Sequence, residues 1–370
     1  MNKCCSYILI IMLFTLNEAP AQNLHQEKLS WKTLPSIPDD KGFAGSFAGT
    51  SGAALLVAGG ANFPDGLAPW SGGVKTWTDQ VFALEPNATA FKMAGKLPRP
   101  LGYGASVQWG DRLLLIGGSN AGGHYSDVLV LAYAGGKFSV EKFPDLPKPL
   151  ANLCAARCGN LVYVAGGLLQ PDSKAALKQF LVLDLQAPGK GWKELPAWPG
   201  PARMLAVAGA VRNTFYLFSG VELADGNRRY LKDAYAYDAH TGWKKLADLP
   251  SPVAAAASPA FTDKSGALLI FGGDDGSLAP KSAELKERHP GFSDAILQYD
   301  PAKNCWKLAG HIPTQKLADA DRKPNKSTWA PVTTTLAEWQ GAIVLPGGEV
   351  RPAVRTPQVR MAVPVKTSIK

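Results

Sequence analysis

The sequence repeats one short pattern six times, an apolar run that ends in a small residue followed by glycine. The six pairs are Gly59-Gly60, Gly117-Gly118, Gly166-Gly167, Ser219-Gly220, Gly272-Gly273 and Gly347-Gly348, separated by 58, 49, 53, 53 and 75 residues. Glycine permits backbone angles and close approaches that a side chain would block. A chain that returns to such a turn at a regular interval is expected to stack similar units.

A second strand-like segment follows each of the first five pairs. These segments are DQVFALE, SDVLVLAY, KQFLVLDL, KDAYAYD and SDAILQYD, and each precedes an aromatic residue, usually Trp, and often a Leu-Pro. A Gly pair, an acidic-apolar strand and a Trp at a period of about 50 residues form the kelch signature. Each unit makes a small antiparallel sheet that only radially stacked neighbours can bury. The sequence therefore predicts an all-β, six-bladed kelch-type β-propeller.

The two ends of the chain are expected to complete one blade together. The sixth Gly pair has no Trp strand after it, whereas the chain begins with an unmatched LSWKTLPSIP that contains Trp31. This segment can supply the outer strand of the last blade. We therefore expect a single propeller domain over residues 22–370, closed by its N- and C-terminal strands.

The first 21 residues have the pattern of a secretory signal. Lys3 precedes an apolar stretch from Tyr7 to Leu16, and Ala19-Pro20-Ala21 offers a small-x-small cleavage site. The stretch is shorter than the ~20 residues that a membrane-spanning helix needs. We expect a signal peptide over residues 1–21, a periplasmic mature protein and no membrane attachment after cleavage.

The composition and charge of the chain limit the kinds of partner that we expect it to bind. The formal net charge is +9, but the Lys and Arg residues are scattered, with no basic helix or dense run, so we expect no nucleic acid as partner. A basic soluble surface and a pocket for a small anion both fit this charge. The five His residues show no metal-ligand spacing, so we expect neither a metal nor a cofactor. The oligomeric state stays open between a monomer and a homo-oligomer.

Charged and polar residues follow the ends of the predicted strands, where two sets of loops should emerge on one face. Asn62 follows the first Gly pair, and Glu349 with Arg355 follows the sixth. Candidate cations after the Leu-Pro ends hold similar places in successive blades, namely Arg99, Lys148 and Arg203. Cations gathered near one mouth would favour an anionic ligand. Each of these residues can equally cap a strand or occupy a turn.

Three segments carry a resemblance to a known family. GFAGSFAGTSGAALLVAGGANFP and LPRPLGYGASVQWGDRLLLIGGSNAGGHYSDVLVL resemble segments of the bacterial N-acetylneuraminate epimerases, also called sialic acid mutarotases. LPGGEVRPAVRT resembles their G-E-x-x-x-x-x-R turn. The order of blades differs from the best-known members, so the chain looks like a cyclically permuted branch.

The resemblance implies an isomerase that interconverts the α and β anomers of N-acetylneuraminate, a small anionic sugar, without a cofactor. It assigns Glu349 as the proton acceptor and Arg355 as the anchor or polarising group for the substrate carboxylate. Arg99 and Arg203 are second candidates for the anchor, and Tyr103 is a candidate proton donor to the ring oxygen. Asn62 and Lys148 complete the expected substrate-binding set.

Two other functions remain open from the sequence. The chain can be a mutarotase for another sugar or sugar acid. It can also be a kelch module that binds a glycan or a protein without catalysis. Anomer exchange, measured with and without the protein, separates these readings.

Overall fold

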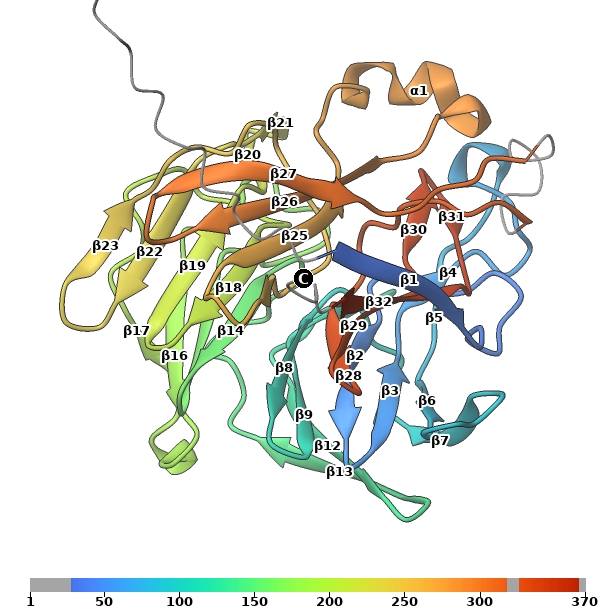
Figure 1. Ribbon diagram of the computed structural model, residues 1–370, viewed down its shortest axis with the longest axis horizontal. Coiled ribbons are helices and arrows are strands. Elements are labelled where there is room, and N and C mark those ends of the chain that lie inside the picture. The colour runs from blue at the N-terminus through green and yellow to red at the C-terminus, as the bar shows by residue number, and fades with distance from the viewer. Residues whose placement is uncertain (1–27, 318–325, 366–370) are drawn as a thin grey trace, which may run out of the picture.

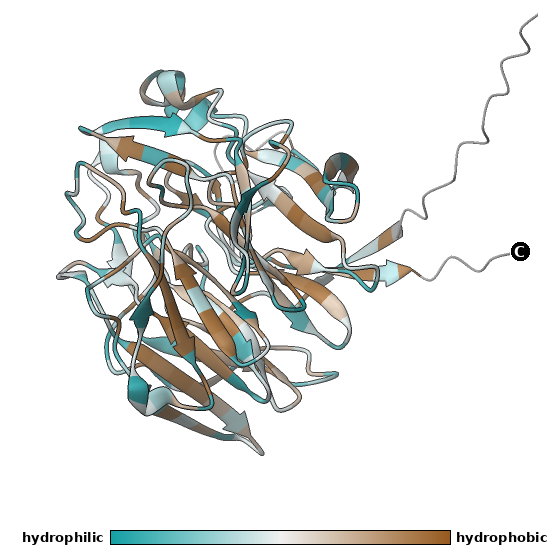
Figure 2. Ribbon diagram, turned by 90° about the vertical axis from the view of Figure 1, so that its left-hand side faces the viewer, coloured by the Kyte–Doolittle hydropathy of each residue, from teal (hydrophilic) through white to brown (hydrophobic). Residues whose placement is uncertain are grey.

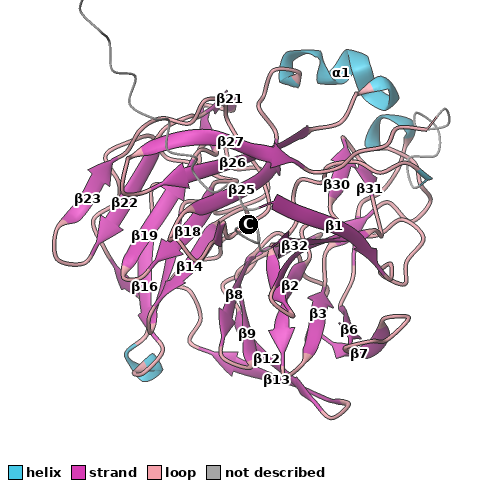
Figure 3. Ribbon diagram, viewed as in Figure 1, coloured by secondary structure: helices cyan, strands magenta, loops and turns pink. Residues whose placement is uncertain are grey.

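Six four-stranded antiparallel sheets surround a common axis, as predicted (Figure 1). The computed structural model describes residues 28–317 and 326–365. The expected signal peptide over residues 1–21 and the start of the domain at residue 22 lie outside this range. Nearly all regular structure is strand (Figure 3).

The blades follow one another along the chain, each running from its inner to its outer strand. Blade 1 holds β2 (Phe47–Ser51), β3 (Ala54–Ala58), β6 (Gln80–Leu84) and β7 (Lys92–Lys96). Blade 2 holds β8 (Ala105–Trp109), β9 (Arg112–Ile116), β12 (Val128–Ala134) and β13 (Lys137–Phe143). Blade 3 holds β14 (Cys154–Cys158), β15 (Leu161–Ala165), β16 (Phe180–Asp184) and β17 (Lys193–Glu194).

The second half of the chain builds blades 4 and 5 in the same way and supplies three strands of blade 6, whose outer strand β1 comes from the start of the described chain. Blade 4 holds β18 (Val207–Val211), β19 (Thr214–Phe218), β22 (Ala234–Asp238) and β23 (Gly242–Lys245). Blade 5 holds β24 (Phe261–Thr262), β25 (Leu268–Gly273), β26 (Ser293–Asp300) and β27 (Cys305–His311). Blade 6 holds β28 (Ala337–Trp339), β29 (Ala342–Pro346), β32 (Val359–Val365) and β1 (Lys28–Leu34).

Short elements decorate the loops. Four two-stranded hairpins follow Gly pairs: β4 (Ala61–Asn62) with β5 (Thr76–Trp77), β10 (Ser119–Asn120) with β11 (Gly123–His124), β20 (Val221–Ala224) with β21 (Asn227–Tyr230), and β30 (Glu349–Arg351) with β31 (Val354–Arg355). The helical turns are η1 (Pro69–Ser71), η2 (Pro188–Lys190), η3 (Ala279–Lys281), α1 (Ser282–Leu285) and η4 (Lys286–Arg288). Within the described ranges, no helix is long and apolar enough to cross a membrane.

The core lies between the blades rather than in one centre. Six apolar clusters occupy the six interfaces between neighbouring sheets, including the interface of blade 6 with blade 1. All five residues of β3 and of β29 are buried, because a neighbouring sheet covers each face of these strands. Apolar colour accordingly runs along the strands of the sheets, and polar colour gathers in the loops (Figure 2).

Three of the recurring tryptophans join blades 3, 4 and 5 to the preceding blade. The indole N–H of Trp192 donates to Pro144, that of Trp243 to Pro196, and that of Trp306 to Ala247, at 2.8 to 2.9 Å. In each case the acceptor carbonyl follows the outer strand of the preceding blade. Each tryptophan thus fills an inter-blade gap and satisfies its one polar atom.

Both ends of the described chain meet in blade 6, which confirms the predicted closure. β1 pairs with β32 over seven residues, from Lys28 opposite Val365 to Leu34 opposite Val359. In Figure 1 the blue strand from the N-terminus lies against the red strand from the C-terminus. Trp31 also meets Phe271 of blade 5 edge to face, with ring centroids 6.2 Å apart.

A closed ring of backbone hydrogen bonds surrounds the axis at one end of the inner strands. One residue per blade donates its N–H to the carbonyl of the residue in the preceding blade, at 2.7 to 2.9 Å. The ring runs through Gly45, Tyr103, Asn152, Leu205, Ala255 and Thr333, and Gly45 closes it by donating to Thr333. All six have φ between 53° and 69°. This left-handed conformation costs a residue with a side chain roughly 1–2 kcal/mol, which the ring must offset.

Candidate functional site

The tails of the Gly pairs and the loops that carry the ring meet on one face of the propeller. Six equivalent antiparallel bridges join them, one per blade. They pair Ala44 with Ala61, Gly102 with Ser119, Ala151 with Leu168, Met204 with Val221, Ala254 with Asp274, and Val332 with Glu349. The residue after each pair therefore lies beside the ring, and the two sets of loops emerge on one face, as the sequence predicted. Glu349 and Asp274 occupy equivalent positions in neighbouring blades.

A cavity of about 510 Å³ opens on this face. Tyr103, Asn152, Leu205 and Thr333 of the ring contribute to its lining, and its other lining residues come from every blade except blade 5. A second lobe of about 320 Å³ extends beneath the blade 5 insert. Leu205, Arg228, Thr333 and Glu349 line both lobes, so the two are neighbours.

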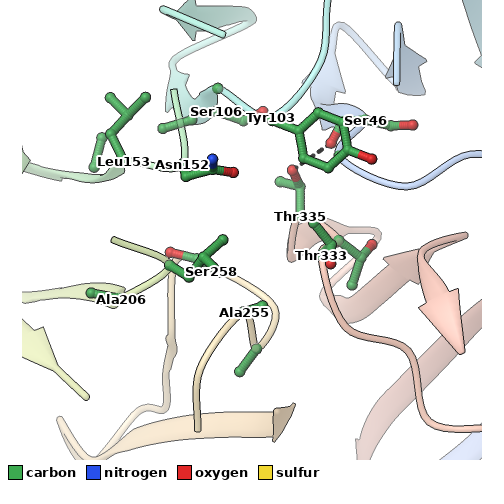
Figure 4. A pocket seen from close by; sticks show the side chains of 17 residues that line it. Ser46, Tyr103, Ser106, Asn152, Leu153, Ala206, Ala255, Ser258, Thr333 and Thr335 are labelled. Carbon is green, nitrogen blue, oxygen red and sulfur yellow. Dashed lines mark hydrogen bonds between the residues drawn. The ribbon is translucent and has the colours of Figure 1, made fainter. Parts of the chain in front are cut away.

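A narrower space of about 70 Å³ lies along the axis among the inner strands. Figure 4 shows side chains from all six blades around it, with the Thr335 hydroxyl donating to the Ser46 carbonyl at 2.8 Å. Its lining is made of small and hydroxyl-bearing residues and includes no carboxylate or cation. Proton-transfer chemistry is better served by the charged cavity on the other side of the ring.

Glu349 and Arg355 form a cross-strand pair at the cavity wall. They stand opposite each other in the β30–β31 register, and Arg355 Nη1 lies 3.2 Å from Glu349 Oε1. The same Oε1 accepts the backbone N–H of Ala353 at 2.8 Å. Gly348 allows the start of this hairpin to lie against Val332, because a Cβ there would lie 2.8 Å from the Val332 carbonyl oxygen. Two donors thus fix one oxygen of the carboxylate.

The Arg355 guanidinium is almost fully enclosed. Its side chain is 4% exposed and lies over the Phe63 ring, 4.9 Å from the centroid. Its Nη2 lies 3.4 Å from the Tyr103 hydroxyl. Burial lowers the pKa of Arg355, but the charges and hydrogen bonds of Glu349 and Tyr103 outweigh it, and the pKa is raised above its usual value. Arg355 is therefore a permanent cation whose nearest carboxylate is Glu349.

Two cations that were not predicted from the sequence also line the cavity. Lys75 Nζ lies over the rings of Trp77 and Tyr103, 5.5 and 5.0 Å from their centroids. Arg228 reaches the cavity from the β20–β21 hairpin of blade 4, opposite blade 1 in the ring. Both sit in inserts of irregular length, where no repeat fixes the register. For Lys75, the sequence signal was the length of the insert that follows the first Gly pair, which places it on this face.

The second lobe is lined by two further ionisable groups, Asp274 and His289. Asp274 accepts the Tyr230 hydroxyl at 2.9 Å and the N–H of Gly276 at 2.9 Å. His289 lies in the same lobe, and its Nδ1 accepts the N–H of Gly291 at 3.2 Å. Burial, as the main cause, lowers the pKa of His289. The bound Nδ1 leaves the proton of the neutral ring on Nε2.

The insert of blade 5 meets the insert of blade 1 beside the cavity, a point the sequence left open. The Trp70 indole N–H donates to the Glu287 carboxylate, and the Glu287 carbonyl accepts a bond from Arg351. Trp70 itself lines the larger lobe. We call this contact between η1 and η4 the insert latch.

Four predicted binding residues do not reach the cavity lining. Arg203 is fully buried and binds Asp233 through both terminal nitrogens, at 2.9 and 2.7 Å. Arg99 pairs with Asp127 at 3.3 Å, and Lys148 is exposed. Asn62 is buried and donates to Asp39 at 3.1 Å. Of the seven predicted residues, the structure brings together Glu349, Arg355 and Tyr103.

Arg99 and Arg203 each pair with an aspartate at the start of a third strand. Asp127 directly precedes β12 and Asp233 directly precedes β22, the third strands of blades 2 and 4. Arg99 and Arg203 therefore close the same ion pair in two blades. Burial alone would raise the pKa of Asp233, but its bonds from Arg203 and Tyr235 hold it below its usual value.

Within the described residues, no group of three or more His, Cys, Asp or Glu side chains has the arrangement of a metal site. Cys154 and Cys158 are free and buried, and burial raises the pKa of each thiol to about 12. These thiols are therefore inert apolar side chains of the core.

The fold and the site define a six-bladed β-propeller with a charged, aromatic-walled cavity at one end of its axis. The profile of a family described as N-acetylneuraminate epimerase matches residues 14–140 and 143–281. The chain belongs to this family. Glu349 and Arg355 lie beyond the matched residues, so their assignment rests on the hairpin geometry and the resemblance of their turn.

Known relatives agree with this membership. A protein of Brucella melitensis named N-acetylneuraminate epimerase is 31% identical over 262 residues, 63% of this chain and 62% of the relative. A Yersinia pestis (strain Pestoides F) protein of the same name is 41% identical over 128 residues, 30% of this chain and 32% of the relative. The solved structure of YjhT matches with a TM-score of 0.61 at 16% identity, covering 87% of this chain and 94% of that chain, which shows the shared fold.

Proposed function

We propose that this protein is a cofactor-independent isomerase that interconverts the α and β anomers of N-acetylneuraminate. Two relatives with this substrate in their names and the family itself support the proposal. The structural support is a fixed carboxylate at the wall of a cavity roomy enough for a nine-carbon sugar acid. We further propose, from the sequence of residues 1–21, that the protein is exported to the periplasm.

The observation that carries the proposal is the asymmetry of the Glu349 carboxylate. Oε1 accepts the Ala353 N–H and faces Arg355, whereas no hydrogen bond to Oε2 is found within the described residues. Oε2 is thus free to take a proton from a ligand in the cavity. Arg355 is the counter-ion of this carboxylate, with Nη1 3.2 Å from Oε1.

Ring opening requires two proton transfers, ring closure reverses both, and anomer exchange involves no net redox change. Glu349 Oε2 removes the proton of the anomeric hydroxyl, the bond between the anomeric carbon and the ring oxygen breaks, and the ring oxygen gains a proton. This gives the open-chain keto acid. Rotation about the bond to the carbonyl carbon, followed by the reverse steps on the other face, gives the other anomer. A positioned base contributes about 10²–10⁴-fold to such a step.

Tyr103 is our candidate for the proton on the ring oxygen. Its hydroxyl lies 3.4 Å from Arg355 Nη2, so it shares the neighbourhood of the base. A nearby cation stabilises the tyrosinate that forms when the proton leaves. Glu349 acting through a water molecule is the alternative donor.

The decisive experiment follows the anomers of freshly released α-N-acetylneuraminate by NMR, with and without the protein. We expect faster decay of the α signal in its presence. Equal decay rates would overturn the proposal. Acceleration with glucose but not with the sugar acid would favour a mutarotase for neutral sugars. Broadened ligand signals without exchange would favour a binding module.

A further inference from the structure

The cavity raises a problem of charge. The proposed substrate brings a carboxylate on the same carbon that carries the reacting hydroxyl. That carboxylate must therefore lie close to the Glu349 carboxylate, and two carboxylates in a partly enclosed site repel each other. A cation beyond those that already balance the protein's own carboxylates is needed.

Arg355 does not meet this need by itself. It is ion-paired with Glu349, its guanidinium lies over the Phe63 ring, and its Nη2 lies 3.4 Å from the Tyr103 hydroxyl. Glu349 and Arg355 together carry no net charge. Arg355 thus serves the base more directly than it serves a ligand.

Lys75 meets the need by its position. It lies at the Tyr103 ring, and Tyr103 is the residue that links this wall to Arg355. Within the described residues, Lys75 has no carboxylate within salt-bridge distance. Its contacts with Trp77 and Tyr103 hold the ammonium beside apolar ring faces, where its attraction for an anion is less screened than in open water.

The charges of the two lobes support the same conclusion. The charged side chains in their lining are Lys75, Arg228, Arg355, Asp274 and Glu349. Three cations face two carboxylates, which leaves one positive charge in excess. A monoanionic ligand restores neutrality.

We propose that Lys75 binds the carboxylate of the substrate and makes the site specific for sugar acids, while Arg355 holds the base. This inference rests on the proposed function for the identity of the sugar. The recognition itself requires only a carboxylate adjacent to the anomeric carbon, so a neutral sugar lacks the group that Lys75 selects.

The test compares N-acetylneuraminate with its methyl ester, which keeps the sugar and removes the charge. Wild-type protein should prefer the acid by about 10- to 100-fold in kcat/KM, the range expected for a charged hydrogen bond. Lys75→Met keeps an unbranched side chain over the two rings and should lose this preference by weakening exchange of the acid alone. Lys75→Arg should restore much of it. Lys92→Met, on the exposed outer strand of the same blade, is the matched control.

Each result bears on the proposal. An unchanged preference in Lys75→Met, or an equal loss for acid and ester, would overturn it. If wild-type protein accelerates neither compound, the proposed function fails, and calorimetric binding of N-acetylneuraminate then decides the role of Lys75. Binding that weakens at least 10-fold in Lys75→Met but not in Lys92→Met would uphold recognition of the carboxylate. Absent binding to wild-type protein, or equal affinities, would overturn it.

Discussion

Glu349 and Arg355 stand directly opposite each other in the β30–β31 hairpin, and their side chains meet at 3.2 Å. Of the five residues between them, only Pro352 and Ala353 form the turn and the others belong to the two strands. The Glu-x5-Arg spacing of the sequence therefore corresponds to a cross-strand pair. Opposed residues in a hairpin point to the same face. Here that face is the cavity, which brings a fixed carboxylate and its counter-ion to one place.

Glu349→Gln should remove about 10²–10⁴-fold of the acceleration of anomer exchange, because an amide does not accept the proton. The amide oxygen can still accept the Ala353 N–H, so the hairpin should persist. NMR exchange rates and thermal unfolding measure the two effects.

Glu222→Gln is the matched control for this variant. Glu222 also follows a Gly pair, but it pairs with Arg229 and lines neither lobe. It should exchange anomers at the wild-type rate. If Glu349→Gln kept that rate as well, another group would have to be the base.

Tyr103→Phe tests the proton donor. The ring remains beside Lys75 and Trp77, so substrate affinity should change little, whereas kcat should fall by about 10²-fold or more. Steady-state kinetics separate the two quantities. An unchanged kcat would assign the ring-oxygen proton to Glu349 through water.

Arg203→Met should destabilise the fold by about 3–5 kcal/mol and leave anomer exchange intact, because it strands the Asp233 carboxylate between blades. Chemical denaturation measures the free energy of unfolding. A selective loss of substrate affinity would instead return Arg203 to the binding residues.

The same ion pair has a pH dependence of defined sign. The pKa of Asp233 in the folded state lies below its usual 3.8. Its contribution to stability is therefore complete above that value and is lost as pH falls through the lowered pKa. The stability difference between wild type and Asp233→Asn should accordingly be constant near neutrality and shrink in acid. A constant difference down to pH 2 would contradict this.

Glu287→Ala should loosen the insert latch by removing the acceptor of the Trp70 indole while keeping the carbonyl that holds Arg351. Since one exposed hydrogen bond is lost, we expect KM to rise roughly 2- to 10-fold. Hydrogen exchange of residues 279–288 should quicken. Glu287→Gln retains an acceptor, so its KM and its rate of hydrogen exchange should lie between those of wild type and Glu287→Ala. Unchanged exchange in Glu287→Ala would show that other contacts hold the inserts together.

The repeated blades could be predicted from the sequence, whereas the cavity residues in the non-repeating inserts could not. The six Gly pairs and the unmatched Trp31 segment specify the blades and their closure, because every blade solves the same burial problem. Lys75 and Arg228 occur in inserts whose lengths differ, so no periodicity places them. Arg203 illustrates the opposite error. Its recurrence was assigned to a ligand, whereas the acidic residue that opens the third strand recurs with it and is its partner.

The ring of backbone hydrogen bonds also determines which groups at the cavity floor are available to bind a ligand. Each ring residue donates its N–H to the ring carbonyl of the preceding blade, so this N–H is not available to a ligand. The chemical character of the floor of the larger lobe therefore depends on the side chains of four ring residues, Tyr103, Asn152, Leu205 and Thr333. Replacing Asn152 or Leu205 with another residue that tolerates the left-handed backbone would change the contacts that a ligand makes at the cavity floor. The backbone hydrogen bonds that join the blades would remain.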